Sequence, residues 1–544
     1  MRLVLGQLNL LVGDIAGNCQ KMEEAIAQAD HHHQADLILF SELSLIGYPP
    51  EDLLLRKGLP QQVKTSLEYL DRVLQQCATL STLVFGVPWW ADGECYNAAV
   101  ICQRGKAPRF YYKQRLPNYG VFDEKRYFSE GTETVLLEVG GICCAVSLCE
   151  DLWHPGVASR ASAAGAELML NLNASPFHHQ KRGEREAVIR QRIRESGLAV
   201  VYVNQVGGQD ELVFDGGSML FAPNGALVAS APEFLPALYP VTVTRGAEGG
   251  IGYRLEQASH PALDSEEASY RAMVLGLRDY VEKNHFPGVI IGLSGGIDSA
   301  LTLAIAVEAL GPQRVEAVTM PSRYTAAMSL EDAAQEAKTL GVELKTISIE
   351  PGFQALLSML ATELPPGEGD ATEENLQARV RGQILMALSN RSGKMVLTTG
   401  NKSEMAVGYA TLYGDMVGGY NAIKDLYKTE VYRMALFCNR QREVIPQRVI
   451  DRPPSAELAP DQRDSDSLPP YSTLDAILRL YIEEQGSRAT LIDAGFEAAV
   501  VDQVIRLVDR NEYKRRQSAP GVKLTRLALG RDRRYPITSG YRHL

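Results

Sequence analysis

The sequence lacks the features of several large classes of protein. It has only eight cysteines in 544 residues, and they form no CxxC pair, so neither a disulfide framework nor a structural zinc site is indicated. Its apolar runs are too short to span a membrane, and its first residues turn polar too soon for a signal peptide. Basic residues are outnumbered, because the chain has 55 of them against 66 acidic residues, and its net charge is -11. These absences argue against a secreted, membrane or nucleic-acid-binding protein and favour a reduced, cytoplasmic one.

One run of histidines, His31-His32-His33, has the composition of a metal site. It lies at the end of a helical pattern, and the sequence offers no second ligand cluster to complete a coordination shell. We therefore expect these three side chains to be solvated.

The length and composition predict two domains. A chain of 544 residues with 45% hydrophobic and 22% charged residues is typical of a globular protein that is too long for one core. Between about 245 and 265 the regular pattern breaks into Gly, Glu, Ser and Pro. We place an N-terminal domain at 1–245, a linker at 246–265 and a C-terminal domain at 266–544.

Strand and helix patterns alternate along both halves of the chain. In the first half, the expected strands are 3–11, 35–40, 83–87, 142–148, 168–172 and 199–204. In the second, the expected strands are 289–293, 314–319, 344–349 and 394–398, separated by helices. This alternation predicts an α/β fold whose parallel sheet binds ligands at the carboxyl ends of its strands. Residues 452–470 are rich in Pro, Asp and Ser and are expected to form a mobile loop.

The most informative segment is the run Ser294-Gly295-Gly296-Ile297-Asp298-Ser299, directly after an apolar strand. A strand that ends in a glycine-rich loop and opens into a helix presents backbone N–H groups and the positive helix end to an anion. A lone loop of this kind is usually just a tight turn, but this one departs from both GxxxxGK[ST] and GxGxxG. It resembles the SGGxDS loop of the N-type ATP pyrophosphatases, which adenylate a substrate and release pyrophosphate. In such a loop, Asp298 makes sense if a divalent cation accompanies the nucleotide.

Three chemically suggestive residues follow predicted strands in the first half: Glu42, Lys113 and Cys149. A cysteine nucleophile needs a base, and an acyl intermediate needs a cation or N–H donors for its oxyanion. Each residue alone has an ordinary explanation, since buried cysteines often fill space and such charges are often solvated.

The segments 41–50, 113–119 and 149–151 together resemble the Glu, Lys and Cys segments of the nitrilase superfamily, over roughly the first 245 residues. This resemblance implies an α-β-β-α sandwich and an amidase, with Glu42 as general base, Lys113 as oxyanion stabiliser and Cys149 as nucleophile. Glu124 matches the accessory glutamate of that superfamily. Ser41 stands where nitrilases often have proline, a change that we expect to be tolerated.

Further segments, 397–404, 408–415 and 425–429, resemble the synthetase domain of NAD synthetases. Thr399 as a helix cap and Lys428 in a surface ion pair are the ordinary alternatives. An amidase fused ahead of such a domain, a doubly wound parallel-sheet ATP pyrophosphatase, is the arrangement of the glutamine-dependent NAD(+) synthetase family. That resemblance implies ATP-dependent amidation of deamido-NAD with ammonia from glutamine, and ATP and Mg²⁺ as co-substrate and cofactor.

The resemblance also implies which residues bind which ligand. The residues implied to bind glutamine are Tyr48, Tyr119, Phe122, Glu150, Ser175, Lys181 and Arg182. Those implied to bind ATP are Gly292, Leu293, Ser294, Gly295, Gly296, Ile297, Asp298, Ser299, Thr399, Lys428 and Ser455. Those implied to bind deamido-NAD are Asn375, Arg379, Arg381, Glu404 and Lys514. The implied magnesium ligands are Asp298 and Glu404. The arginines among them have an alternative as the solvated face of a helix.

Two rival functions remain open at this point. A GMP- or asparagine-forming synthetase shares the SGGxDS loop but normally carries a different glutaminase domain. A non-catalytic nucleotide-binding protein with a decayed amidase is argued against by Glu42, Lys113 and Cys149 occurring together. The implied partners are small molecules, with neither nucleic acid nor membrane. The resemblance also implies a homo-oligomer that is at least a dimer, with an octamer as the larger alternative.

Overall fold

The computed structural model describes residues 1–246, 250–363, 371–460 and 462–541. The chain divides into two compact units, Met1–Leu263 and Asp264–Leu544. The segment 246–265, expected to be a linker, contains a strand, β15 (Ile251–Leu255), that pairs with the strand before it. No helix in the described part of the chain is long and apolar enough to cross a membrane.

The first unit contains two large sheets. The strands of the seven-stranded sheet, in spatial order, are β15, β14 (Ala237–Arg245), β1 (Arg2–Gln7), β2 (Leu37–Phe40), β3 (Thr82–Ala91), β4 (Glu94–Gln103) and β5 (Arg109–Tyr112). Those of the six-stranded sheet are β13 (Leu227–Ser230), β12 (Met219–Phe221), β9 (Ala199–Asn204), β8 (Leu168–Asn173), β7 (Ile142–Leu148) and β6 (Leu136–Val139). A small hairpin joins β10 (Val206–Gln209) to β11 (Leu212–Asp215).

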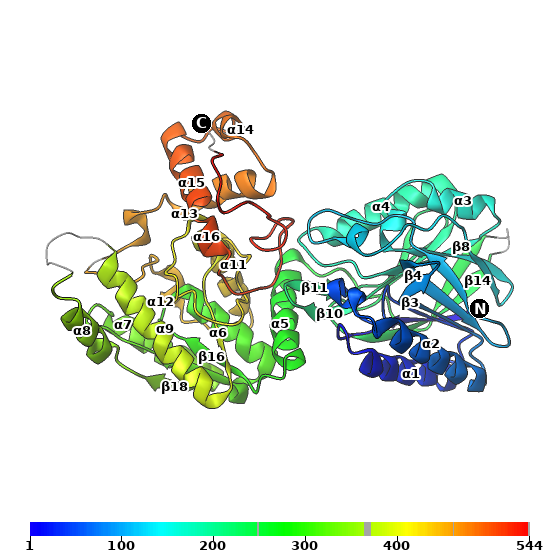
Figure 1. Ribbon diagram of the computed structural model, residues 1–544, viewed down its shortest axis with the longest axis horizontal. Helices are drawn as coiled ribbons and strands as arrows, with labels where there is room; N and C mark the ends of the chain where they lie inside the picture. Colours follow the sequence, from blue (N-terminus) through cyan, green and yellow to red (C-terminus); the bar gives the residue numbers. More distant parts are fainter. Residues whose placement is uncertain (247–249, 364–370, 461, 542–544) are drawn as a thin grey trace. The chain divides into compact units, whose positions relative to one another are not determined.

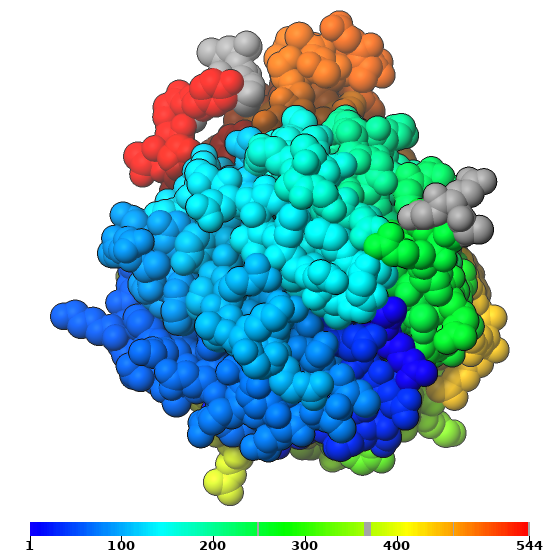
Figure 2. All heavy atoms as spheres, turned by 90° about the vertical axis from the view of Figure 1, so that its right-hand side faces the viewer, coloured from blue at the N-terminus to red at the C-terminus, as the bar shows by residue number. Residues whose placement is uncertain are grey.

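Helices cover the outer face of each large sheet (Figure 1). They are α1 (Ile15–His31) and α2 (Leu59–Gln76) on one side, and α3 (Val157–Ala163) and α4 (Lys181–Ser196) on the other. Short 3-10 turns form η1 (Glu51–Leu55), η2 (Glu124–Arg126) and η3 (Cys149–Leu152). Figure 2 shows one face of this unit, where segments of the first half of the chain, in blue to cyan, cover most of the surface.

Alternation along the strands explains this layering. Leu37 and Leu39 of β2 join the core between the sheets, whereas Ile38 and Phe40 pack against α1 and α2. Strands buried on both faces read as continuous apolar runs, as 37–40 does. The predicted α-β-β-α sandwich is confirmed.

The second unit is built on a four-stranded parallel sheet in the order β18-β17-β16-β19. Its strands are β16 (Val289–Gly292), β17 (Val315–Thr319), β18 (Glu343–Thr346) and β19 (Met395–Leu397). The helices around it are α5 (Ser265–Lys283), α6 (Ile297–Leu310), η4 (Pro312–Arg314), α7 (Ala327–Leu340), α8 (Glu350–Met359), α9 (Thr372–Ser392) and α11 (Lys428–Cys438).

Helices on both faces confirm the predicted doubly wound sheet. Helix α6 is apolar almost all round, and ten of its fourteen residues are buried. On the other face, α8 and α9 close a core around Ile290 and Val396. The strand order reverses at β16, so the loops after β16 and β19 meet at the switch point where such sheets bind ligands.

The rest of this unit is a second, helical cluster with its own core. Its helices are α10 (Lys402–Val407), α13 (Tyr471–Leu478), η6 (Arg479–Glu483), α14 (Arg488–Asp493), α15 (Ala498–Arg510) and α16 (Glu512–Arg515). The segment 452–470, expected to be a loop, follows α12 (Gln447–Asp451) and includes η5 (Asp464–Asp466).

Candidate active sites

Cys149 lies at a sharp turn directly after β7. Its backbone φ is +37°, a left-handed conformation that residues other than glycine seldom adopt. The residue is 6% exposed. Burial raises the pKa of the Cys149 thiol well above its ordinary value, and Glu42 adds to this while Lys113 opposes it. A thiol in this setting is protonated at rest and needs a base to act as a nucleophile.

Lys113 supplies the charge at this turn. Its Nζ donates to Glu42 Oε1 at 2.6 Å and to Glu124 Oε1 at 2.8 Å, and its side chain is fully buried. Burial alone would lower the pKa of Lys113, but the carboxylates of Glu124 and Glu42 raise it well above the ordinary value. Lys113 is therefore a permanent cation within the electrostatic reach of Cys149.

The two carboxylates are held differently. Glu42 accepts hydrogen bonds from the Asn97 amide at 2.8 Å and from the backbone N–H of Ala174 at 3.1 Å, besides Lys113. Burial raises the pKa of Glu124 to about 7, although Lys113 lowers it. Tyr48 donates to Glu124 at 2.8 Å. Asn97 bridges Glu42 and Glu124 but was not among the predicted residues, because a lone asparagine within a strand carries no local signal.

The aromatic residues predicted to bind glutamine form one group. Phe122 makes edge contacts with Tyr48 and Tyr119, at centroid distances of 6.4 and 5.5 Å. The Tyr119 hydroxyl donates to both carboxylate oxygens of Glu150 at 3.1 Å. Because Glu150 directly follows Cys149, this group stands beside the turn that carries the thiol.

The other three predicted residues lie at or near the start of α4. Lys181 sits 3.9 Å from the ring centre of Trp153, and burial and Arg185 lower its pKa. Ser175 accepts a hydrogen bond at 3.1 Å from Arg185, a residue that the sequence analysis did not single out. Arg185 is buried and ion-paired with Asp215 at 2.8 Å. Arg182 turns elsewhere, to Glu233 and Ser230.

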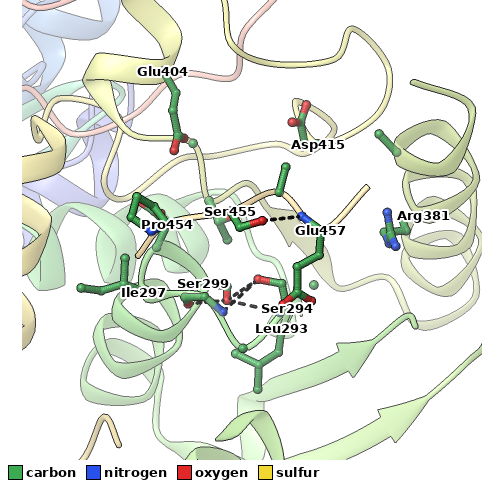
Figure 3. Close-up of a pocket in the computed structure, with 18 of the residues that line it drawn as sticks. Leu293, Ser294, Ile297, Ser299, Arg381, Glu404, Asp415, Pro454, Ser455 and Glu457 are labelled. Atoms are coloured by element: carbon green, nitrogen blue, oxygen red, sulfur yellow. Dashed lines mark hydrogen bonds between the residues drawn. The ribbon is translucent and has the colours of Figure 1, made fainter. Parts of the chain in front are cut away.

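The second site is a cavity of about 300 Å³ at the switch point of the parallel sheet. All eight residues of the glycine-rich loop, 292–299, line it, together with Thr399, Lys428 and Ser455. Figure 3 shows Ser294 and Ser299 on the loop side, with Ser455 above them and Arg381 reaching in from α9. The loop is bound internally, because the backbone N–H of Ser294 and of Gly296 donate to the Ser299 and Ser294 hydroxyls at 3.2 Å each.

Gly295 cannot be replaced without disturbing the loop. Its φ is +82°, and a Cβ there would lie 2.2 Å from the backbone oxygen of Ser329, at the start of α7. The loop therefore rests directly on the backbone of the next helix.

Lys428 joins the two carboxylates predicted to hold magnesium. Its Nζ donates to Asp298 Oδ2 at 2.5 Å and to Glu404 Oε1 at 3.1 Å, and the residue is 2% exposed. Burial raises the pKa of Glu404 to about 8, with Lys428 opposing and Asp298 adding to the shift. The surface ion pair considered for Lys428 is therefore wrong. Thr399 as a helix cap is wrong too, since Asn401 caps α10 and bonds to Asp298 at 2.9 Å.

The residues predicted to bind deamido-NAD separate into two groups. Arg381 and Glu404 line the cavity, and burial lowers the pKa of Arg381 to about 10. The other three contact the segment 408–414 instead. Asn375 accepts from the Thr411 hydroxyl at 2.7 Å, Arg379 donates to the Leu412 carbonyl at 3.2 Å, and Lys514 donates to the Gly408 and Ala410 carbonyls at 2.8 Å.

Residues 452–458 and Asp464 also contribute to the cavity wall, and among them Ser455 alone was predicted to bind a ligand. Glu457 accepts from the Ser329 hydroxyl at 2.7 Å and from Arg452. Asp464 is buried at the cavity and accepts from the Tyr471 hydroxyl at 2.8 Å. In the described part of the chain, no group of three or more His, Cys, Asp or Glu residues has the arrangement of a metal site.

Comparison with known proteins covers both units of the chain. The carbon-nitrogen hydrolase family model matches residues 2–247, and the NAD synthase family model matches residues 269–518. A glutamine-dependent NAD(+) synthetase from Xanthomonas campestris is 46% identical, over 99% of this chain and 98% of its own. The chain belongs to the glutamine-dependent NAD(+) synthetase family.

Other members of this family agree at full length. The synthetase from Thermotoga maritima is 44% identical over 100% of this chain and 99% of its own. The solved synthetase from Acinetobacter baumannii, in complex with ADP, has a TM-score of 0.79 and 44% identity, covering 100% of this chain and 99% of its own. The family's reaction is the glutamine-hydrolysing amidation of deamido-NAD, so the predicted family and reaction are confirmed.

Proposed function

We propose that this chain converts deamido-NAD to NAD, using ammonia from glutamine hydrolysis and ATP that is cleaved to AMP and pyrophosphate. The proposal rests above all on two buried lysines, each shared by two carboxylates. Lys113 stands beside the turn that carries Cys149, and Lys428 stands beside the glycine-rich loop. One chain thus holds an electrostatic site for amide hydrolysis and another for phosphate chemistry.

In the first site, Glu42 takes the proton of the Cys149 thiol as the sulfur attacks the amide carbon of glutamine. The tetrahedral oxyanion accepts a hydrogen bond from the Lys113 ammonium. Collapse forms a thioester, and Glu42 returns the proton to the departing ammonia. Glu42 then takes a proton from water, which attacks the thioester to release glutamate and the thiol. The raised thiol pKa makes this base necessary.

In the second site, the nicotinate carboxylate of deamido-NAD attacks the α-phosphorus of ATP, and pyrophosphate leaves. Ammonia then attacks the acyl carbon and displaces AMP. The positive N-terminal end of α6, at the loop, and the Lys428 ammonium suit the negative charge of the phosphates. The acylated phosphate is needed because a free carboxylate is a poor electrophile.

The residues present fit a magnesium ion. Mg²⁺ in nucleotide sites is commonly held by one or two carboxylates together with phosphate oxygens and water, so a three-residue protein cluster is not required. Asp298 and Glu404 both line the cavity, and each side chain is 17% exposed. Held by these carboxylates, Mg²⁺ would neutralise charge on the phosphates.

Arg381 and Glu404, on the cavity wall, are the direct candidates for contact with deamido-NAD. Asn375, Arg379 and Lys514 would act through the segment 408–414, whose carbonyl and hydroxyl groups they bind. For glutamine we keep Tyr48, Tyr119, Phe122, Glu150, Ser175, Lys181 and Arg182, and add Arg185 as a support for Ser175.

We also propose a homo-oligomer, at least a dimer, on the basis of the family's organisation. Light scattering that showed a stable and fully active monomer would contradict it. A cytoplasmic location agrees with eight cysteines that are all free thiols.

Two variants test the assignment of the two sites. Cys149→Ala removes the nucleophile and should abolish NAD formation with glutamine, while added ammonium salts restore it, better at higher pH. Asp298→Ala should abolish NAD formation with either nitrogen donor. Pyrophosphate release should require deamido-NAD, and xanthosine monophosphate or aspartate should not replace it. Glutamine use by Cys149→Ala, or ammonia use by Asp298→Ala, would contradict the corresponding assignment.

A further inference from the structure

Asp151 is a buried carboxylate that the mechanism above does not use. It is fully buried and accepts four hydrogen bonds. Its Oδ1 accepts from the backbone N–H groups of Gln114 and Arg115, both at 2.9 Å. Its Oδ2 accepts from the backbone N–H of Leu148 at 2.9 Å and from the Tyr111 hydroxyl at 2.7 Å.

These four donors flank Lys113 and Cys149, the proposed oxyanion stabiliser and nucleophile. Leu148 directly precedes Cys149, and Gln114 directly follows Lys113. The two segments belong to different sheets, because β5 lies at the edge of the seven-stranded sheet and β7 lies in the six-stranded one. The backbone N–H of Lys113 bonds within its own sheet, to the Asn97 carbonyl at 2.8 Å. Asp151 therefore ties the segment of Lys113 to the turn of Cys149, across the sandwich.

The turn at Cys149 needs such a tie. A left-handed backbone at a residue with a Cβ is strained and persists only where the surroundings hold it. Asp151 holds the N–H group just before this residue and is itself the third residue of η3. Arg160 of α3, which follows this turn in the chain, also donates to the Gln114 side chain.

We propose that Asp151 is a positioning residue that sets the separation between the Lys113 ammonium and the Cys149 sulfur. This rests on the proposed roles of those two residues in glutamine hydrolysis. The oxyanion exists only after the sulfur has attacked, so a wider separation weakens an interaction made in the transition state. The expected loss is in kcat for glutamine rather than in KM. Displacements of about 1 Å in such sites cost on the order of 100-fold.

The chain offers a matched control in the same unit. Asp30 is also buried and also accepts from three backbone N–H groups, those of Ala78, Thr79 and Leu80, and from one hydroxyl, that of Thr79. It connects the end of α1 to the segment after α2, and none of these partners is a proposed catalytic residue. Asp30→Asn and Asp151→Asn thus remove the same kind of support in two places.

The experiment measures NAD formation with glutamine and with ammonium chloride, and the melting temperature, for both variants. Both should lower the melting temperature. Asp151→Asn should lose on the order of 100-fold in kcat with glutamine, with KM for glutamine nearly unchanged and ammonium-dependent turnover retained. Asp30→Asn should keep its kcat with glutamine. Equal kcat losses in the two variants, or a loss in Asp151→Asn confined to KM, would overturn the proposal.

A milder variant covers the case in which Asp151→Asn does not fold. Tyr111→Phe removes one donor to Asp151 and little volume. It should lower kcat with glutamine by about tenfold and retain ammonium-dependent turnover, and full glutamine turnover in this variant would overturn the proposal. Cys149→Ala separates the two levels of inference, because its continued use of glutamine would refute the amidase itself, whatever Asp151 does.

Discussion

At the scale of single residues, the proposed glutaminase site depends on one lysine that two carboxylates share. Lys113 bonds to both Glu42 and Glu124. Because one buried cation serves two buried carboxylates, it can compensate only one of their negative charges, and a buried charge without compensation is costly. Glu124 titrates near neutrality, because burial raises its pKa to about 7. It is ionised above that pH and protonated below it. Protonation of Glu124 removes the negative charge of one of the two carboxyl groups that bond to Lys113.

Glutamine-dependent kcat/KM should therefore fall as the pH drops through about 7. Glu124→Gln has nothing to titrate at this position, so it should lack this limb of the pH profile and run at a lower plateau, by about tenfold. The measurement is glutamine hydrolysis between about pH 5 and 9. Glu130→Gln is a control, since Glu130 pairs with Lys125 at the surface, 3.5 Å away, and should keep the wild-type profile. An unchanged acidic limb in Glu124→Gln would contradict the assignment.

At the scale of elements, the glycine-rich loop is positioned by helix α7. Gly295 packs directly on the backbone of Ser329, and the hydroxyl of Ser329 donates to Glu457, which also lines the cavity. The loop, the start of α7 and the segment 452–458 thus form one packed unit. Its weak point is the contact at Gly295, which leaves no room for a Cβ.

Gly295→Ala should push the loop away from α7 and reduce NAD synthesis on the order of 100-fold with either nitrogen donor. Glutamine hydrolysis should remain. Gly393→Ala is the matched control, because Gly393 has a similar φ of +73° but its Cβ would meet only Pro287, at 3.7 Å. It should cost about 1 kcal/mol of stability and leave synthesis intact. Equal activity of the two variants would show that the close contact is unimportant.

At the scale of the whole molecule, the chain holds two compact units with separate cores. Units of this kind commonly unfold as separate cooperative steps. The proposed ligands also divide between them, since the residues for glutamine lie in Met1–Leu263 and those for ATP lie in Asp264–Leu544.

Calorimetry should accordingly resolve two transitions. ATP with Mg²⁺ at about 100 times its Kd should stabilise one of them by about 2.7 kcal/mol, by mass action. An electrophilic glutamine analogue that modifies Cys149 should raise the melting temperature of the other transition. The Cys149→Ala variant should not show this increase. Hydrogen exchange assigns each transition to its unit. Equal shifts of both transitions with ATP alone would contradict the division.

Much of the fold could be predicted from local patterns. Buried strands and the loop after β16 are encoded within a few residues of each other, so periodicity and glycine placement reveal them. The strongly amphipathic α15 also had such a signal, with Val501, Val504, Ile505 and Val508 on one buried face, but the sequence analysis overlooked it. The loop expected at 452–470 illustrates the limit, because its composition gives no sign that Asp464 becomes buried at a cavity.

The sequence by itself determined the elements, the family and the residue types at both sites, because each motif is a short run whose chemistry is local. Only the tertiary structure decided the partners. Asn97 bonds to Glu42 and Glu124 from a separate strand. Lys514 donates its hydrogen bonds to backbone carbonyls and does not line the cavity. Those outcomes depend on how distant segments pack and on which charges lose their water, and neither follows from spacing along a chain.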